Sequence, residues 1–272
     1  MASIFYAHFL KNKTSAVYGC SYDNNLQLNF SRATDLKEIR KFKTSKYSIS
    51  YIGNTYKNIR QDLINGLYVL FIGTPCQVSG LKNFLNKEYP NLLTIDLICH
   101  GVPSQIYLDE YIKSLNLNTQ PNSLTFRGKK DFFFTLYKDN TILYSKNSDE
   151  DIFYKAFLDG LFYRENCYSC EFATSKRVGD LSLGDFWGLG DEIPFNYDKQ
   201  DGVSVLLVNT EKGKIVFNEV KDKIFFEKRT LEEAIKGNEQ LKHPTRKHKN
   251  YDLFLKLYSE FGLKKALEET LK

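Results

Sequence analysis

The sequence lacks features that would place it among nucleic-acid-binding proteins. Its 38 lysines and arginines outnumber 33 acidic residues and give a net charge of +5. The basic residues are spread along the chain, however, and do not form the dense track that holds a phosphate backbone. We therefore expect no nucleic acid among the partners.

Long apolar runs and targeting signals are also missing. The first residues, MASIFYAHFLKNK, are apolar over too short a stretch to span a bilayer, and they include neither a charged leader nor a small-residue cleavage site. The sequence therefore predicts a cytoplasmic protein with no membrane span. Its 272 residues, 42% of them hydrophobic, suffice for a substantial core.

Neither common nucleotide-binding fingerprint occurs. The GTPCQ segment, residues 73–77, lacks the G-x-x-x-x-G-K-[ST] form of a P-loop, and no G-x-G-x-x-G follows a predicted strand. A nucleotide cofactor would have to bind in another arrangement. The sequence also contains no internal repeat and no low-complexity linker, so we expect one domain over residues 1–272.

Two strand-turn-helix units indicate an α/β fold. YVLFIG, residues 68–73, is apolar nearly throughout, as in a parallel strand covered on both faces, and a helix is predicted directly after it over residues 76–86. The pattern repeats with a buried strand that starts at residue 92 and a helix over residues 104–115. We therefore expect a parallel or mixed central sheet flanked by helices.

Other segments add to this core. Residues 16–31 predict a hairpin, and GVSVLLVNT, residues 202–210, predicts one more buried strand. Aromatic and polar residues alternate in a β-rich insertion, a β-meander at about residues 120–148. Residues 165–191, dense in glycine, cysteine and aspartate, predict a loop, and residues from about 230 to 272 predict a helical tail.

Two cysteines follow the predicted core strands. Five cysteines, an odd number, do not suggest a disulfide framework, and in a reducing compartment spaced cysteines more often hold metal or do chemistry. Cys76 and Cys99 fall at the carboxyl ends of strands, where such sheets bind ligands. Cys76 also starts a predicted helix, which favours its thiolate. By itself it could be a nucleophile, a metal ligand or a buried structural residue.

Cys167 and Cys170 form a C-x-x-C pair, which can hold a metal, a cluster or a redox disulfide. A thioredoxin-type role would place the pair at a helix start, and here it lies in a predicted loop. With Cys76 and Cys99 it supplies four thiolates, which suit a tetrahedral zinc or a [4Fe-4S] cluster. Because two of the four come singly from strand ends, we favour a redox cluster, with Cys20 left as a structural residue.

His100 and the segment around Trp187 are further candidates. His100 follows Cys99 and could donate a proton, hydrogen-bond a cofactor or merely occupy a loop. GDLSLGDFWGLG, residues 179–190, combines Asp185 with the single tryptophan, Trp187. Its glycines allow a flat ligand to approach the backbone and the indole can stack on it, or the segment forms a tight turn with Trp187 in the core.

Together these residues resemble the beta subunits of coenzyme F420-reducing hydrogenase and dehydrogenase. The combination of GTPCQ, DLICHG and GDFWG is highly specific. The matching segments run in order through most of the chain: TSKYSISYIGNTY (44–56), VLFIGTPCQVSGLKNFL (69–85), LLTIDLICHGVPS (92–104), CYSC (167–170), RVGDLSLGDFWG (177–188) and GVSVLLVNTEKG (202–213).

The resemblance implies an oxidoreductase in which FAD lies near a [4Fe-4S] cluster and passes electrons between a hydride carrier and one-electron chemistry. It implies that Cys76, Cys99, Cys167 and Cys170 ligate the cluster. Lys46 would contact a phosphate or the reduced, anionic ring. The implied flavin pocket comprises Ser45, Lys46, Tyr47, Gly73, Thr74, Gln77, His100, Gly101, Asp185 and Trp187.

The resemblance also bears on partners. The chain looks like a short form, since many relatives carry an N-terminal ferredoxin-like C-x-x-C-x-x-C-x-x-x-C-P run that does not occur here. We therefore expect a separate electron donor, such as ferredoxin, reduced flavin or F420. Similar proteins occur in bacterial surface-polysaccharide gene neighbourhoods, which implies a small-molecule acceptor such as a sugar.

A rival class of function stays open at this stage. The chain could be a zinc-stabilised or degenerate non-redox binding module of a biosynthetic complex. The cysteine count is the same for zinc and for a cluster, so the count alone does not separate the two. A homo-oligomer is compatible with the sequence in either case.

Overall fold

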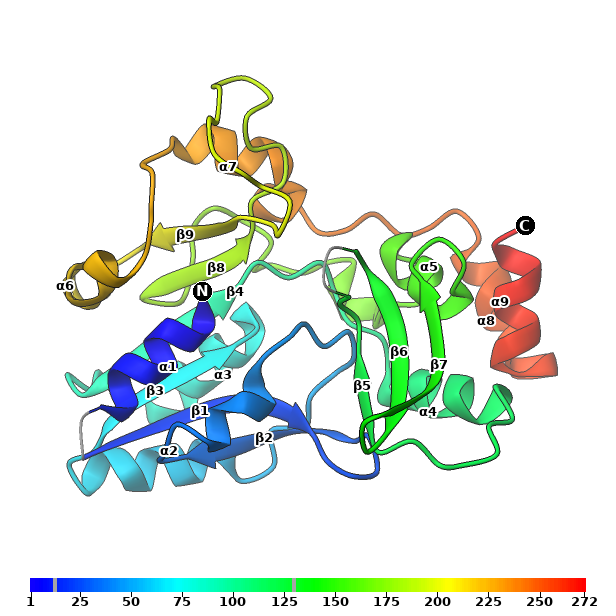
Figure 1. Ribbon diagram of the computed structural model, residues 1–272, viewed down its shortest axis with the longest axis horizontal. Coiled ribbons are helices and arrows are strands. Elements are labelled where there is room, and N and C mark those ends of the chain that lie inside the picture. The colour runs from blue at the N-terminus through cyan, green and yellow to red at the C-terminus, as the bar shows by residue number, and fades with distance from the viewer. Residues whose placement is uncertain (12–13, 129–130) are drawn as a thin grey trace.

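A six-stranded sheet forms the centre of the protein (Figure 1). The computed structural model describes residues 1–11, 14–128 and 131–272. Strands β1, β3, β4 and β8 are parallel, and the edge strands β2 and β9 run antiparallel to their neighbours. In the order in which they lie side by side, the strands are β2 (Leu28–Ala33), β1 (Ser15–Tyr22), β3 (Tyr68–Gly73), β4 (Leu92–Leu97), β8 (Leu181–Asp185) and β9 (Ser204–Val208). The predicted mixed α/β architecture and the predicted hairpin are confirmed.

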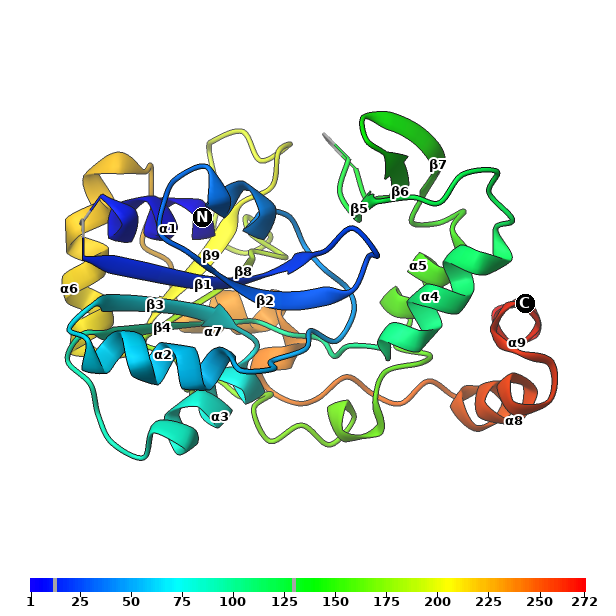
Figure 2. The ribbon, with the colours of Figure 1, turned by 90° about the horizontal axis from the view of Figure 1, so that it is seen from below.

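Helices cover both faces of this sheet (Figure 2). Helices α1 (Ala2–Leu10) and α6 (Glu211–Val220) cover one face, and α2 (Thr55–Ile64) and α3 (Pro75–Leu85) cover the other. Successive strand residues point to opposite faces. In β3, Leu70 therefore packs under α1, while the neighbouring Phe71 joins the core beneath α2 and α3. This double covering explains why the YVLFIG segment is apolar nearly throughout.

A second part lies beyond the carboxyl ends of the parallel strands (Figures 1 and 2). Its antiparallel sheet, the predicted meander, comprises β5 (Ser123–Thr125), β6 (Phe133–Lys138) and β7 (Thr141–Asn147). Helices α4 (Gln105–Ser114), α5 (Ile152–Leu158), α8 (Tyr251–Phe261) and α9 (Leu263–Thr270) pack with it. Aromatic side chains such as Phe126, Phe153 and Phe254, all 0% exposed, form its core.

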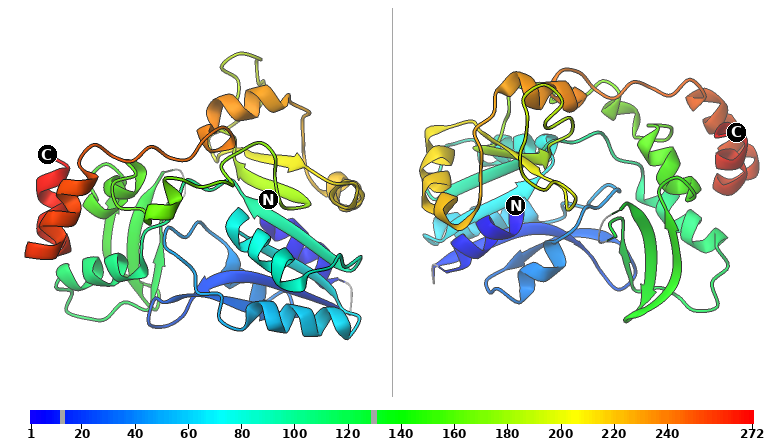
Figure 3. Two further views of the ribbon diagram at one scale, coloured as in Figure 1. Left: turned by 180° about the vertical axis from the view of Figure 1, so that it is seen from behind. Right: turned by 45° about the horizontal axis from the view of Figure 1, so that its top comes forward.

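The segment from β4 to α4 and the segment from η4 (Glu239–Leu241) to α8 both join the two parts (Figure 3). The predicted helical tail thus divides. Helix α7 (Leu231–Gly237) lies near β8 and β9, whereas α8 and α9 belong to the second part. The other short 3-10 helices are η1 (Glu38–Phe42), η2 (Glu165–Cys167) and η3 (Lys221–Lys223).

One sequence prediction was wrong in part, because the expected loop over residues 165–191 contains the inner strand β8. Its five residues are enclosed by β4 and β9, and Asp180 just before them is buried. The Asp180 carboxylate accepts hydrogen bonds from the backbone N–H and the hydroxyl of Thr94, both at 2.8 Å. Pairing with neighbouring strands, rather than local propensity, makes this segment a strand.

Within the three described ranges, no helix has both the length and the apolar character needed to cross a membrane.

Candidate functional site

The carboxyl ends of the parallel strands meet at one edge of the central sheet, which faces the second part (Figures 1 and 2). Strand β3 ends at Gly73, and Cys76 is the second residue of α3. Strand β4 ends at Leu97, and Cys99 follows two residues later. The predicted placement of both cysteines at strand ends is confirmed. Open α/β sheets bind their ligands at this edge.

A buried glutamine fixes the turn that presents Cys76. Gln77 Oε1 accepts a hydrogen bond from the Thr74 N–H at 3.0 Å, and Gln77 Nε2 donates to Ser50 Oγ at 2.8 Å. Thr74 Oγ1 lies 3.1 Å from the sulfur of Cys76, which is exposed. The side chain of Gln77 therefore holds the turn, and Thr74 caps the helix beside the thiol.

The segment over residues 44–56 lies beside this turn and beside the segment that follows β4. The Ile49 N–H donates to the Pro103 carbonyl at 3.2 Å, and Ser50 Oγ accepts a hydrogen bond from the side-chain amide of Gln77. The structure thus brings the segment that contains Ser45, Lys46 and Tyr47 to the edge where Cys76 and Cys99 lie.

The three flavin candidates in this segment have different surroundings. The Lys46 ammonium donates to the carbonyls of Phe42, Lys43 and Thr44 at 3.2, 2.7 and 3.0 Å, and burial lowers the pKa of the amine, an effect that the nearby Cys20 thiol opposes. The Tyr47 ring stacks on Phe157, with centroids 4.2 Å apart, at the edge of the aromatic core. Ser45 is half-buried.

Cys99 lies in a segment that continues from β4 towards the second part. The Ile98 N–H extends the pairing of β4 with β8 by donating to the Leu183 carbonyl at 2.8 Å. His100 Nδ1 lies 3.0 Å from Gln240 Nε2, and the His100 carbonyl accepts from Thr245 Oγ1 at 2.5 Å. Contacts from the carboxyl-terminal quarter of the chain therefore hold the Cys99 segment in place.

The C-x-x-C segment runs alongside the Cys99 segment. Pro103 and Tyr163 form a β-bridge, and the Arg164 N–H donates to the Val102 carbonyl at 3.0 Å. The Cys167 N–H in turn donates to the Arg164 carbonyl at 2.8 Å, in the short helix η2. This pairing brings Cys167 and Cys170 to the edge that carries the two strand-end cysteines.

The thiols of Cys99 and Cys167 are influenced by the other cysteines of this edge. Burial raises the pKa of Cys99 to about 12. A hydrogen bond from the backbone of Gly101 to the sulfur opposes this rise in pKa, whereas the thiols of Cys76, Cys167 and Cys170 increase it. Burial also raises the pKa of Cys167, which Val102 hydrogen-bonds through its backbone, and Cys76 and Cys170 again contribute. Cys99 thus lies within electrostatic reach of the other three thiols, and Cys167 within reach of Cys76 and Cys170.

In the described parts of the chain, no three His, Cys, Asp or Glu side chains stand at the spacing that would hold a metal ion. The four thiols are therefore gathered at one edge without forming a closed ion site. Cys20, which we predicted to be structural, lies near the carboxyl end of β1. Burial raises the pKa of its thiol, and Lys46 opposes this rise.

Asp185 and Trp187 lie where β8 ends. The Asp185 carboxylate forms an ion pair with Arg127 from the turn between β5 and β6. The Arg127 guanidinium lies over the Phe132 ring at 4.3 Å from its centroid. The ring centroids of Phe132 and Trp187 are 5.9 Å apart, and Trp187 is 43% exposed. Trp187 is therefore not a core residue, and its exposed indole lies near the end of β8, the strand beside β4.

Sequence reasoning missed Arg127, Phe132 and Tyr163. Arg127 and Phe132 lie on the meander, which the sequence identified only as an insertion, so no sequence motif joined them to Asp185. Tyr163 is one of 18 tyrosines, and only the fold shows that its ring packs on Gly101.

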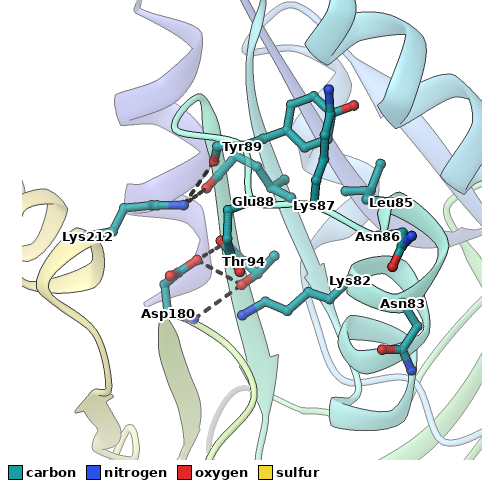
Figure 4. A pocket seen from close by; sticks show the side chains of 11 residues that line it. Lys82, Asn83, Leu85, Asn86, Lys87, Glu88, Tyr89, Thr94, Asp180 and Lys212 are labelled. Carbon is teal, nitrogen blue, oxygen red and sulfur yellow. Dashed lines mark hydrogen bonds between the residues drawn. The ribbon is translucent and has the colours of Figure 1, made fainter.

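A hollow of about 320 Å³ lies at the opposite end of the sheet, between α3, α6 and the amino ends of β4 and β8 (Figure 4). Lys212 of α6 donates to the carbonyls of Tyr89 and Leu92 at 3.0 and 2.9 Å. Asp180 pairs there with Thr94, as described above. The bonds of Lys212 attach α6 to the start of β4, and those of Asp180 attach the segment before β8 to the same strand.

Comparisons with known proteins agree with the resemblance seen in the sequence. Residues 67–234 match the family that describes the C terminus of the coenzyme F420 hydrogenase/dehydrogenase beta subunit. A chain of the F420-reducing [NiFe] hydrogenase complex from Methanosarcina barkeri has a similar fold, with a TM-score of 0.55 and 17% identity, over 99% of this chain and 83% of that chain. No curated protein gave a significant match.

Proposed function

The chain belongs to the coenzyme F420 hydrogenase/dehydrogenase beta-subunit family, and on this basis we propose that it is an iron-sulfur flavoprotein oxidoreductase. In the proposed reaction, electrons pass between a reduced donor, such as a hydride carrier, and a small-molecule substrate, through FAD and a [4Fe-4S] cluster. The observation that carries the proposal is the gathering of Cys76, Cys99, Cys167 and Cys170 at the ligand-binding edge of the sheet.

The donor set fits an iron-sulfur cluster, because four thiols come from three segments of chain around one edge. Cys76 lies at a helix amino end, where backbone N–H groups favour a thiolate. The backbone of Gly101 hydrogen-bonds the sulfur of Cys99, and the backbone of Val102 hydrogen-bonds that of Cys167. The same backbone groups would hydrogen-bond the thiolates of a bound cluster, and such bonds tune its reduction potential. When bound, such a cluster supplies one-electron transfer.

The surroundings of β8 fit the isoalloxazine ring of FAD. Trp187 and Phe132 present apolar ring faces, and Arg127 contributes a positive charge beside them. In this proposal Thr74, His100 and Asp185 offer polar contacts. The turns at Gly73 and Gly101 and the side chains of Ser45, Lys46, Tyr47 and Gln77 shape the wall. When bound, the flavin accepts a hydride and releases electrons singly.

A separate electron donor is part of the proposal. The hydrogenase with the similar fold works as a complex, which supports delivery of electrons by a partner such as ferredoxin, reduced flavin or F420. We further propose a sugar intermediate of bacterial surface-polysaccharide biosynthesis as the acceptor, and a homo-oligomer as one form of the protein.

Anaerobic purification followed by iron, sulfide and zinc analysis tests the proposal. We expect brown protein with about four iron and four sulfide per chain, since four thiolates hold one such cluster. Stoichiometric zinc without iron would instead identify a zinc-stabilised binding module. Titration of the reconstituted protein with FAD under nitrogen tests the flavin, and no binding at high micromolar FAD would refute hydride transfer.

A further inference from the structure

A fully buried ion pair connects the two segments that carry Cys99 and Cys170. The side chains of Arg177 and Asp96 are 1% and 0% exposed. Arg177 donates to Asp96 Oδ1 from Nη2 at 2.5 Å and from Nε at 3.0 Å. Asp96 lies on β4, three residues before Cys99.

The guanidinium also binds the backbone of the cysteine loop. Arg177 Nη1 donates to the carbonyls of Phe172 and Thr174 at 3.1 and 3.2 Å, two and four residues after Cys170. Nη2 also donates to the Leu97 carbonyl at 3.1 Å, and Nε is shared with Ser182 Oγ at 3.2 Å. All five N–H groups of the guanidinium therefore have acceptors, which come from β4, β8 and the loop after the C-x-x-C pair.

The second oxygen of Asp96 completes the arrangement. Asp96 Oδ2 accepts from the Gly179 N–H at 2.7 Å, on the chain that leads from the cysteine loop into β8. Removing two charges from water is costly, so a buried ion pair is weak evidence for stability alone. Here its hydrogen bonds are directed at two backbone segments that bear cysteines.

We propose that Arg177 and Asp96 are positioning residues that set the distance between Cys99 and the C-x-x-C pair before a metal centre binds. The inference rests on the proposed function in one respect, that the four cysteines bind a metal centre. A lysine at position 177 would keep the charge but lose the planar fork that reaches Asp96 and the loop carbonyls together. An asparagine at position 96 would present an amide nitrogen to a neighbouring donor.

The test uses Co²⁺ as a probe of thiolate geometry in the apo protein, alongside reconstitution with iron and sulfide. We expect Arg177→Lys and Asp96→Asn to weaken Co²⁺ binding by about 10- to 100-fold, the usual effect of residues that orient metal ligands. The reconstituted variants should also show a shifted cluster potential and a changed electron paramagnetic resonance spectrum. The matched control is Arg32→Lys, in the more exposed pair between Arg32 of β2 and Asp62 of α2, and this variant should bind Co²⁺ as the wild type does.

Circular dichroism and thermal melting show whether each variant is folded. Ser182→Ala removes only one acceptor of the Arg177 guanidinium, so we expect this variant to lose less Co²⁺ affinity. Folded variants that bind Co²⁺ with unchanged affinity and keep the wild-type potential would overturn the inference while the proposed function stands. Wild-type protein that binds Co²⁺ through thiolates but assembles no cluster would refute the proposed function, and the Co²⁺ affinities would still decide the role of Arg177. Wild-type protein that binds neither would overturn both.

Discussion

The ring of Tyr163 packs directly against Gly101. A Cβ atom at Gly101 would lie within 3.0 Å of three ring atoms of Tyr163, and Gly101 has a φ of +130°, which L side chains rarely adopt. Tyr163 is 3% exposed and pairs with Pro103 through a β-bridge. The contact therefore holds the segment of Cys99 against the segment of Cys167.

Gly101→Ala should destabilise the protein and disturb the cysteine site. The strained backbone costs about 1–3 kcal/mol, and displacement of the buried Tyr163 ring adds to that cost. Urea unfolding measures the loss. Gly66→Ala is the control, because Gly66 also has a positive φ, +80°, but a Cβ there would meet no atom within 4 Å. Equal losses in the two variants would show that the Tyr163 contact carries no cost of its own.

Cys76→Ser and Cys167→Ser should each prevent assembly of the proposed cluster, because each removes one of four thiolate ligands. Iron and sulfide per chain, measured after anaerobic reconstitution, provide the readout. Cys20→Ser should assemble the cluster normally, since this thiol lies on β1 near Lys46 and is not one of the proposed ligands. A full complement of iron in the Cys76 variant would contradict the ligand assignment.

Binding of FAD should quench the fluorescence of Trp187, the only tryptophan of the chain. The indole is 43% exposed at the edge where we place the flavin, and stacked rings quench one another's emission. The expected outcome is a saturable decrease during anaerobic titration with FAD. Unchanged emission while FAD binds, as measured by equilibrium dialysis, would place the flavin elsewhere.

Ionisation of Tyr56 should lower the free energy of unfolding at alkaline pH. Its hydroxyl donates to the Gln77 carbonyl at 2.7 Å, and burial raises its pKa from the usual 10.0 to about 12, with a contribution from Cys76. Because the folded pKa is the higher one, this contribution to stability is complete below pH 10 and is lost as the pH rises towards 12. Urea midpoints measured across this window should fall less steeply for Tyr56→Phe. Parallel slopes for the two proteins would argue against this role of Tyr56.

Local patterns in the sequence determined much of the scaffold. A strand that is covered on both faces reads as a continuous apolar run, such as YVLFIG. Strands β3 and β4, and the position of a cysteine after each of them, could therefore be predicted. Turn residues and alternating aromatics likewise predicted the hairpin and the meander. Strand β8 escaped prediction because its five residues become a strand only between β4 and β9.

The composition of the candidate site followed from the sequence, whereas its assembly did not. The cysteine types, their number and the C-x-x-C spacing are visible in the printed chain. Arg127 beside Asp185, Tyr163 on Gly101 and Arg177 between two cysteine segments depend on contacts between residues 58, 62 and 81 positions apart. Such contacts carry no local periodicity, because they are selected by packing and by the need to satisfy buried charges. The sequence by itself thus determined which ligands are available, and only the tertiary structure decided which of them meet.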